Sequence, residues 1–131
     1  MRYLLDTSVA IALRDGDPAV LARGEHLDPT PLVTIVTMIE LEGGVARAES
    51  GREQRRAALD AMCETLDIIA FGPAEALAYG RILTECGFVR GRVIDRMIAA
   101  QAIVAGATLA TLNARDFRDI PDLKVEDWLQ A

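Results

Sequence analysis

The chain has 131 residues, of which 51% are hydrophobic and 26% charged, a composition typical of a globular domain and not of a disordered chain. Its formal net charge of −6 excludes a nucleic-acid binder that relies on overall positive charge, so contact with RNA or DNA needs local help from cations or a partner. A single histidine makes a Cys/His zinc site and a Ser-His-Asp triad poor candidates. With no signal peptide and no apolar run that could cross a bilayer, we expect one cytoplasmic domain over residues 1–131 with no membrane contact.

The apolar run Tyr3–Leu5 predicts a short strand buried on both faces. Asp6 marks the carboxyl end of this strand, and we expect Thr7 or Ser8 to cap a helix over 9–13. In an open α/β sheet, ligands bind outside the carboxyl ends of the strands, so Asp6 is a candidate site residue. The alternative is that Asp6 only caps the helix.

The next elements are a short helix and a second strand. Asp17 followed by Pro18 predicts a helix to about Gly24, and the β-branched run Leu32–Val36 predicts a buried strand. The spacing Thr37-x-x-Glu40 matches a capping box and predicts a helix from there to about residue 48. Glu40 would then lie in the first turn, where it is either a site residue or only part of the cap.

The remainder of the chain continues the alternation of helices and strands. The predicted elements are a helix to about residue 64, a strand at 66–71, helices at 74–85 and 93–104, a strand at 108–112, and a weak edge strand at 124–125. This alternation predicts a mostly parallel sheet of four to five strands with helices on both faces, a three-layer α/β/α fold.

Four acids occupy positions that such a sheet would bring together. Asp6 and Glu40 follow the first two strands, and Asp116 follows the fourth by four residues, so these three come out at one edge of the sheet. Asp95 begins the apolar helix 93–104 and reaches the same edge only if the preceding loop carries it there. Asp116 alone is a weak candidate, because a turn cap or an ion pair with an adjacent arginine would also explain it.

Asp95 is the most informative of these acids. Its helix is almost entirely apolar, and burying a carboxylate is costly unless it is paired or bound to a metal. The alternative is an ion pair of Asp95 with Arg92 or Arg96. Glu42 is a different acid from the candidate Glu40, because two positions along a helix turn the side chain by about 200° to another face.

Carboxylates gathered at one edge repel each other. Two unit charges about 4 Å apart cost on the order of 4 kcal/mol at an effective dielectric constant of ~20. A cluster without a lysine must therefore take up protons or bind divalent cations, and oxygen ligands favour Mg²⁺ or Mn²⁺. The predicted chemistry is attack of metal-activated water on a phosphodiester, with one ion or two.

Four short stretches carry a family resemblance: Leu4–Val9, Thr37–Leu41 with Gly44, Asp95–Ala102 and Thr111–Phe117. In this order, over nearly the whole chain, they resemble the four motifs of PIN domains. The short single-domain form is similar to the VapC-type toxins of bacterial toxin–antitoxin pairs.

The resemblance implies a PIN-like fold and a Mg²⁺- or Mn²⁺-dependent endoribonuclease. It implies a catalytic, metal-binding site formed by Asp6, Glu40, Asp95 and Asp116 and supported by Thr7, Ser8 and Asn113. It also implies an RNA substrate, a homodimer, and a cognate antitoxin that blocks the site, in a pair or a higher assembly. Arg90-Gly91-Arg92, just before the third motif, is expected to contact phosphate or to shield the acids. The alternative function is a PIN-like module with little catalytic activity that binds RNA or protein.

Overall fold

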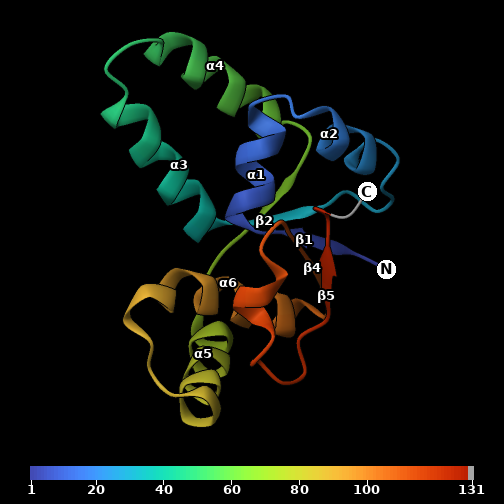
Figure 1. The fold of residues 1–131 in the computed structure, drawn as a ribbon, viewed down its shortest axis with the longest axis vertical. Coiled ribbons are helices and arrows are strands. Elements are labelled where there is room, and N and C mark those ends of the chain that lie inside the picture. The colour runs from blue at the N-terminus through green and yellow to red at the C-terminus, as the bar shows by residue number, and fades with distance from the viewer. Residues whose placement is uncertain (130–131) are drawn as a thin grey trace.

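The computed structural model describes residues 1–129, and its centre is a parallel sheet (Figure 1). The strands are β1 (Tyr3–Leu5), β2 (Leu32–Thr34), β3 (Asp67–Ile69), β4 (Thr108–Thr111) and β5 (Val125–Asp127). Their order is β3-β2-β1-β4-β5, and every neighbouring pair is parallel. The predicted parallel sheet is thus confirmed, with the C-terminal strand at one edge as expected.

Helices cover both faces of this sheet (Figure 1). The α-helices are α1 (Thr7–Arg14), α2 (Pro18–Gly24), α3 (Ile35–Arg47), α4 (Arg52–Cys63), α5 (Pro73–Cys86) and α6 (Val93–Ala105), with 3₁₀ turns η1 (Arg90–Arg92) and η2 (Ala114–Phe117). In Figure 1, α1 to α4 lie on one side of the strands and α5 and α6 on the other. Over residues 1–129, none of the helices combines the length and the apolar character that a membrane span requires.

Two hydrophobic cores separate the three layers. Leu5 points into a core with Val9 of α1 and Leu59 of α4, whereas Leu4 points into a core with Ile98 of α6 and Leu109 of β4. Adjacent residues of one strand face opposite sides of a sheet, so β1 is buried on both faces. This is the predicted α/β/α arrangement.

The register of the strands sets the level at which the polar residues begin. Leu5 pairs with Val33 of β2 and with Ala110 of β4. The next residue along β1 is Asp6, and its backbone N–H donates to the Ala110 carbonyl at 3.0 Å. Asp6 and Thr111 therefore lie at the same carboxyl edge of the sheet.

The start of α1 differs from the prediction. Asp6, not Thr7 or Ser8, is the N-cap, and its carboxylate accepts a hydrogen bond from the Val9 backbone N–H at 3.0 Å. Thr7 is already helical, and the Ser8 hydroxyl instead donates to Asp6. The cap moves to Asp6 because β1 ends there and its side chain can reach the free N–H groups of the first turn.

The start of α3 also differs from the prediction. The helix begins at Ile35, two residues earlier than expected, and Thr34 is its N-cap through a 3.0 Å hydrogen bond from the Thr37 backbone N–H. The predicted capping box of Thr37 and Glu40 is therefore wrong, because Thr34 already satisfies the donor at the helix start. Glu40 lies in the second turn of α3, not the first.

Candidate active site

Asp6 is a buried carboxylate at the end of β1, with 3% of its surface exposed. It accepts hydrogen bonds from the Ser8 hydroxyl at 2.6 Å, from the Val9 backbone N–H at 3.0 Å, and from the Thr111 hydroxyl. Burial raises the pKa of Asp6 above its usual value, and these three donors oppose that rise. The carboxylate is therefore oriented by donors from both α1 and β4.

Glu40 reaches the same edge of the sheet from α3. The Thr7 hydroxyl donates to the Glu40 carboxylate at 2.7 Å and lies 2.9 Å from the Thr37 hydroxyl. Thr7 directly follows Asp6, so this contact connects Glu40 to the start of α1. Glu40 itself is exposed to solvent.

Asp95 lies in the first turn of α6 and is half-buried. Its pKa is raised to about 6, mainly by burial and further by the negative charges of Asp6, Asp116 and Glu40. The charges of the other three predicted acids therefore act on Asp95, which places these acids on the same side of the molecule as Asp95. The loop before α6 carries Asp95 to the edge where the strands end.

The arginines near Asp95 pair with other acids. Arg92 donates to the main-chain oxygen of Asp116 at 2.8 Å, and its guanidinium lies 3.6 Å from the Asp116 carboxylate. Arg96 pairs with Asp119 at 2.9 Å. Within residues 1–129, neither arginine forms an ion pair with Asp95, although the Arg92 charge lowers the pKa of Asp95.

The donor atoms of this site suit a hard divalent cation. All four side chains offer carboxylate oxygens, and their combined negative charge is what a cation would neutralise. In the described part of the chain, no three acid, cysteine or histidine side chains are close enough to form a complete set of ligands. A bound ion would therefore need water or small side-chain rotations to complete its coordination.

The three supporting residues have different surroundings. The Ser8 hydroxyl donates to Asp6 and accepts from the Leu112 backbone N–H at 3.1 Å, which connects α1 to the end of β4. Thr7 holds Glu40, as described above. Asn113 is exposed and lines a hollow together with Arg92 and Asp116.

Two threonines that were not among the predicted site residues lie at this edge. Thr111 is completely buried and donates to Asp6, and Thr37 is completely buried beside Thr7. Thr111 begins the stretch Thr111–Phe117, one of the four that carry the family resemblance. Its position at the end of β4 is the signal that could have identified it as a site residue. Its partner became clear only from the register of β1 against β4.

Glu42 is separate from the acidic edge. Its carboxylate pairs with Arg56 of α4, which also holds the pKa of Glu42 below its usual range. The expected difference in orientation between Glu40 and Glu42 is thus observed.

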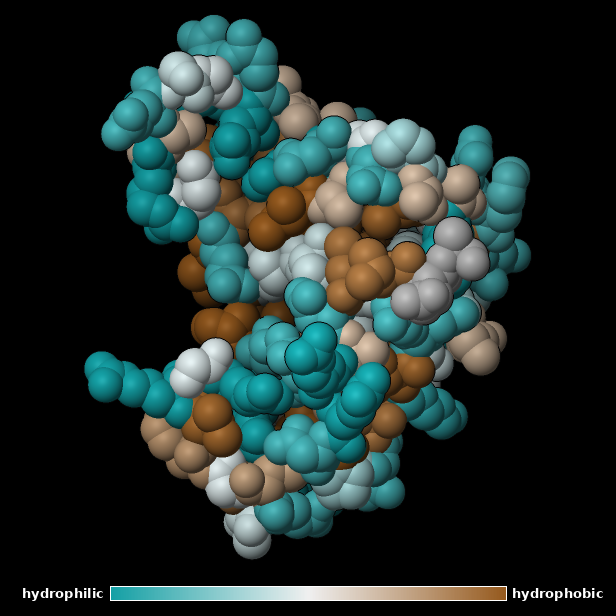
Figure 2. Space-filling model, in the orientation of Figure 1, coloured by the Kyte–Doolittle hydropathy of each residue, from teal (hydrophilic) through white to brown (hydrophobic). Residues whose placement is uncertain are grey.

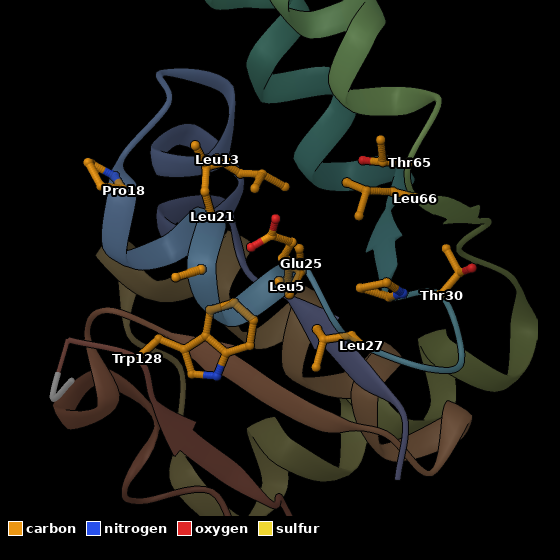
Figure 3. Close-up of a pocket in the computed structure, with 13 residues that line it drawn as sticks. Leu5, Leu13, Pro18, Leu21, Glu25, Leu27, Thr30, Thr65, Leu66 and Trp128 are labelled. Atoms are coloured by element: carbon orange, nitrogen blue, oxygen red, sulfur yellow. The ribbon is translucent and has the colours of Figure 1, made fainter.

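An apolar hollow lies away from the acids, beside α1 and α2. It measures about 600 Å³, and its lining includes Pro31 and Leu66, which precede β2 and β3. Figure 3 shows Leu21 and Trp128 on one side of this mostly apolar hollow and Leu66 on the other. None of the predicted site residues lines it, so it does not take part in the chemistry of the acids.

Comparisons with known proteins identify the family. The PIN domain family matches residues 3–123. Ribonuclease VapC2 from Rickettsia felis is 31% identical over 98% of both chains, and the tRNA(fMet)-specific endonuclease VapC from Shigella flexneri is 27% identical over 98% of both.

Solved structures show the same likeness. VapBC2 from Rickettsia felis, bound to a DNA fragment from its promoter, superposes with a TM-score of 0.87 at 30% identity, covering 98% of this chain and 99% of that one. DNA-bound VapBC from Salmonella typhimurium also gives 0.87, at 25% identity and 98% coverage of each chain. The chain therefore belongs to the PIN-domain family, in the group that includes the VapC proteins.

Proposed function

We propose that the chain is a Mg²⁺- or Mn²⁺-dependent endoribonuclease and the toxin of a type II toxin–antitoxin pair. Its membership of the family and the ribonuclease and endonuclease relatives support this function. The single observation that carries the metal-dependent part is the pKa of Asp95, which the charges of three other carboxylates help to raise to about 6. A divalent cation would remove that repulsion.

Several carboxylates of the chain would bind the ion together. Asp6 is the most rigid ligand, because three hydrogen bonds orient its carboxylate. Glu40, held by Thr7, and the carboxylates of Asp95 and Asp116 would bind directly or through water. When bound, the ion supplies a water of lowered pKa and offsets the charge that develops on the phosphate.

Cleavage of RNA tests this function directly. Purified protein is incubated with labelled RNA in Mn²⁺, in Mg²⁺ and in EDTA, and Mn²⁺ is added in parallel to a thermal melt. We expect cleavage only with divalent ions, and a Tm that Mn²⁺ raises for the wild type but not for Asp6→Asn. RNA binding without cleavage in any metal would favour the alternative, a binding module with little catalytic activity.

A cognate antitoxin is the partner that this function requires. The similar solved structures include complexes called VapBC, and one of these is called a toxin–antitoxin system. An arginine from such a partner would fit among the four carboxylates and neutralise them in place of the metal. If the neighbouring gene encodes a small partner protein, its co-expression with this chain should yield a complex that does not cleave RNA.

A homodimer is the second proposed assembly, and α3 offers a surface for it. Ile35 and Ile39 are 38% and 65% exposed. Residues four apart on a helix lie on the same face, so the two isoleucines form an apolar stripe. A second copy of the chain would cover them.

A further inference from the structure

A pocket lined by arginines lies next to the acidic site. It measures about 420 Å³, and we call it the arginine pocket; its lining is Val89, Arg92, Arg96, Arg115, Arg118 and Asp119. Four arginines and one aspartate give this lining a formal charge of +3, in a chain whose net charge is −6. Such a local excess of positive charge attracts an anion.

Arg96 is the buried member of this lining, with only 2% of its surface exposed. It donates to the Gly87 carbonyl at 3.2 Å and to the Asp119 carboxylate at 2.9 Å. Its Nε is also buried and has no hydrogen-bond partner among residues 1–129. A buried donor without a partner costs free energy, and an anionic oxygen is a group that would satisfy it.

Arg115 and Arg118 supply the exposed charge of the pocket. Both belong to the segment around η2, and within the described chain neither forms an ion pair. The acid that lines the pocket, Asp119, is already paired with Arg96. In Figure 2, hydrophilic side chains gather below the centre of the view, where Figure 1 places the segment that contains η2. Guanidinium groups in this setting suit phosphate, which they bind in a bidentate manner.

The arginine pocket adjoins a second hollow that reaches Asp116, one of the four predicted site acids. The neighbouring hollow of about 560 Å³ shares Arg92, Arg115 and Arg118 with it and is also lined by Asp116. Arg92 itself contacts Asp116 through its main-chain oxygen. A ligand with several phosphates in a row could therefore place one among the arginines and another at the carboxylates.

We propose that the arginine pocket binds a backbone phosphate of the RNA substrate next to the one that is cleaved. This inference rests on the proposed ribonuclease function and adds to it the residues that hold the substrate. In a chain of net negative charge, the pocket supplies the local attraction that single-stranded RNA needs. Inorganic phosphate carries the same chemistry, so the experiment separates it from RNA.

The test measures binding of a short fluorescein-labelled single-stranded RNA by anisotropy in EDTA, at NaCl concentrations from about 50 to 200 mM. The test variant is Arg115→Gln/Arg118→Gln. The control, Arg47→Gln/Arg55→Gln, makes the same change of charge at exposed positions on α3 and α4. We expect the test variant to bind about tenfold more weakly and to lose about 0.7 from the slope of log K against log salt, the value for one lost phosphate contact on a single strand.

Two further arms complete the test. Arg115→Lys/Arg118→Lys should restore the salt slope but only part of the affinity, because lysine keeps the charge and loses the bidentate geometry. If the glutamine variant matches the wild type in both affinity and slope, the proposal is wrong. A glutamine variant that loses stabilisation by inorganic phosphate in a thermal melt but binds RNA normally would also overturn it, since the pocket would then serve a free anion.

The binding assay needs no catalysis, so its outcome is separate from that of the proposed nuclease. If the wild type binds RNA through this pocket but never cleaves it, the proposed nuclease function is wrong and the assignment of the pocket to RNA binding is supported. If the wild type cleaves RNA and the glutamine variant does so with unchanged KM, the nuclease stands and the pocket assignment fails.

Discussion

The hydroxyl of Thr111 donates a hydrogen bond to the carboxylate of Asp6 and joins residues that are 105 positions apart in the chain. Both side chains are buried at the carboxyl edge of the sheet. They meet because β1 and β4 are neighbouring parallel strands that end at the same level, with Leu5 opposite Ala110. The pairing of the two strands thus places a donor from β4 on a buried carboxylate that follows β1, before any ligand binds.

Removal of this donor should weaken the site and the fold together. We expect Thr111→Val to lower the free energy of unfolding by about 1–3 kcal/mol, because it leaves a buried carboxylate with one donor fewer. Urea unfolding measures this loss, and calorimetry should show weaker Mn²⁺ binding as Asp6 becomes less well oriented. Thr111→Ser keeps the hydroxyl and is the matched control. Unchanged Mn²⁺ affinity in Thr111→Val would contradict the role given to this contact.

The carboxylates themselves should be needed for cleavage but not for folding. We expect Asp6→Asn and Asp95→Asn each to reduce Mn²⁺-dependent RNA cleavage by about 100-fold or more, because a ligand to the cation is lost. Asparagine is also a good N-cap, so Asp6→Asn should still begin α1. Glu42→Gln, which only removes a surface pair with Arg56, should cleave nearly as well as the wild type. A large loss in Glu42→Gln would mean that Glu40 is the wrong glutamate.

The raised pKa of Asp95 predicts how stability depends on pH without metal. The pKa of Asp95 is about 6 in the folded protein against 3.8 for an unperturbed aspartate, so the folded state holds this proton more tightly than the unfolded state. The contribution of this proton to the free energy of unfolding is fully present below about pH 4. It is lost as the pH rises through about 6. Asp95→Asn removes the charge and should be more stable than the wild type at pH 7 by about 1–2 kcal/mol, after allowance for partial exposure.

Chemical denaturation at several pH values in EDTA measures this difference. The gap in unfolding free energy between Asp95→Asn and the wild type should be small near pH 4 and should grow towards pH 7. Saturating Mn²⁺ should close the gap, because only the wild type gains from the ion. A gap that does not change with pH would show that Asp95 is not under repulsion from its neighbours.

Arg92 should also affect the pKa of Asp95. Its positive charge lowers the pKa of Asp95, so Arg92→Gln should raise that pKa further. Since a cation competes with the proton for the carboxylate, the pH midpoint of Mn²⁺ binding should move upward in Arg92→Gln. Isothermal calorimetry at several pH values reports this without RNA. Arg92→Lys keeps the charge and should leave the midpoint close to that of the wild type.

The exposed isoleucines of α3 predict the effect of a charge on the proposed homodimer. Ile39→Asp places a carboxylate in the apolar stripe, and we expect the dissociation constant of the dimer to rise by at least about 100-fold. Size-exclusion chromatography with light scattering measures the mass. Val104→Asp places the same charge at another exposed apolar position, at the end of α6, and should leave the mass unchanged. Ile39→Asp with the mass of a dimer would place the interface elsewhere.

Local patterns in the sequence were enough to predict the layers of the fold. The buried strand at Tyr3–Leu5, the start of α2 at Asp17 and Pro18, and the helix predicted over 93–104 depend on residues next to each other in the chain, and the structure has all three. The acids could be chosen as candidates for a similar reason, because a carboxylate that follows an apolar strand or begins an apolar helix is conspicuous in any fold. A sequence alone determines such features because burial, capping and chain stiffness act over a few residues.

Only the tertiary structure decided which of these groups meet. Thr34, and not Thr37, caps α3, because its hydroxyl accepts the hydrogen bond from the Thr37 backbone N–H. The helix therefore begins at Ile35, and Glu40 lies in its second turn. The pairing of Arg92 with Asp116 joins groups far apart in the chain. So does the arginine pocket, which gathers residues from the start of α6 and from the segment after β4. Their meeting depends on strand order and register, and these follow from the packing of the whole sheet against its helices, which no short stretch of sequence encodes.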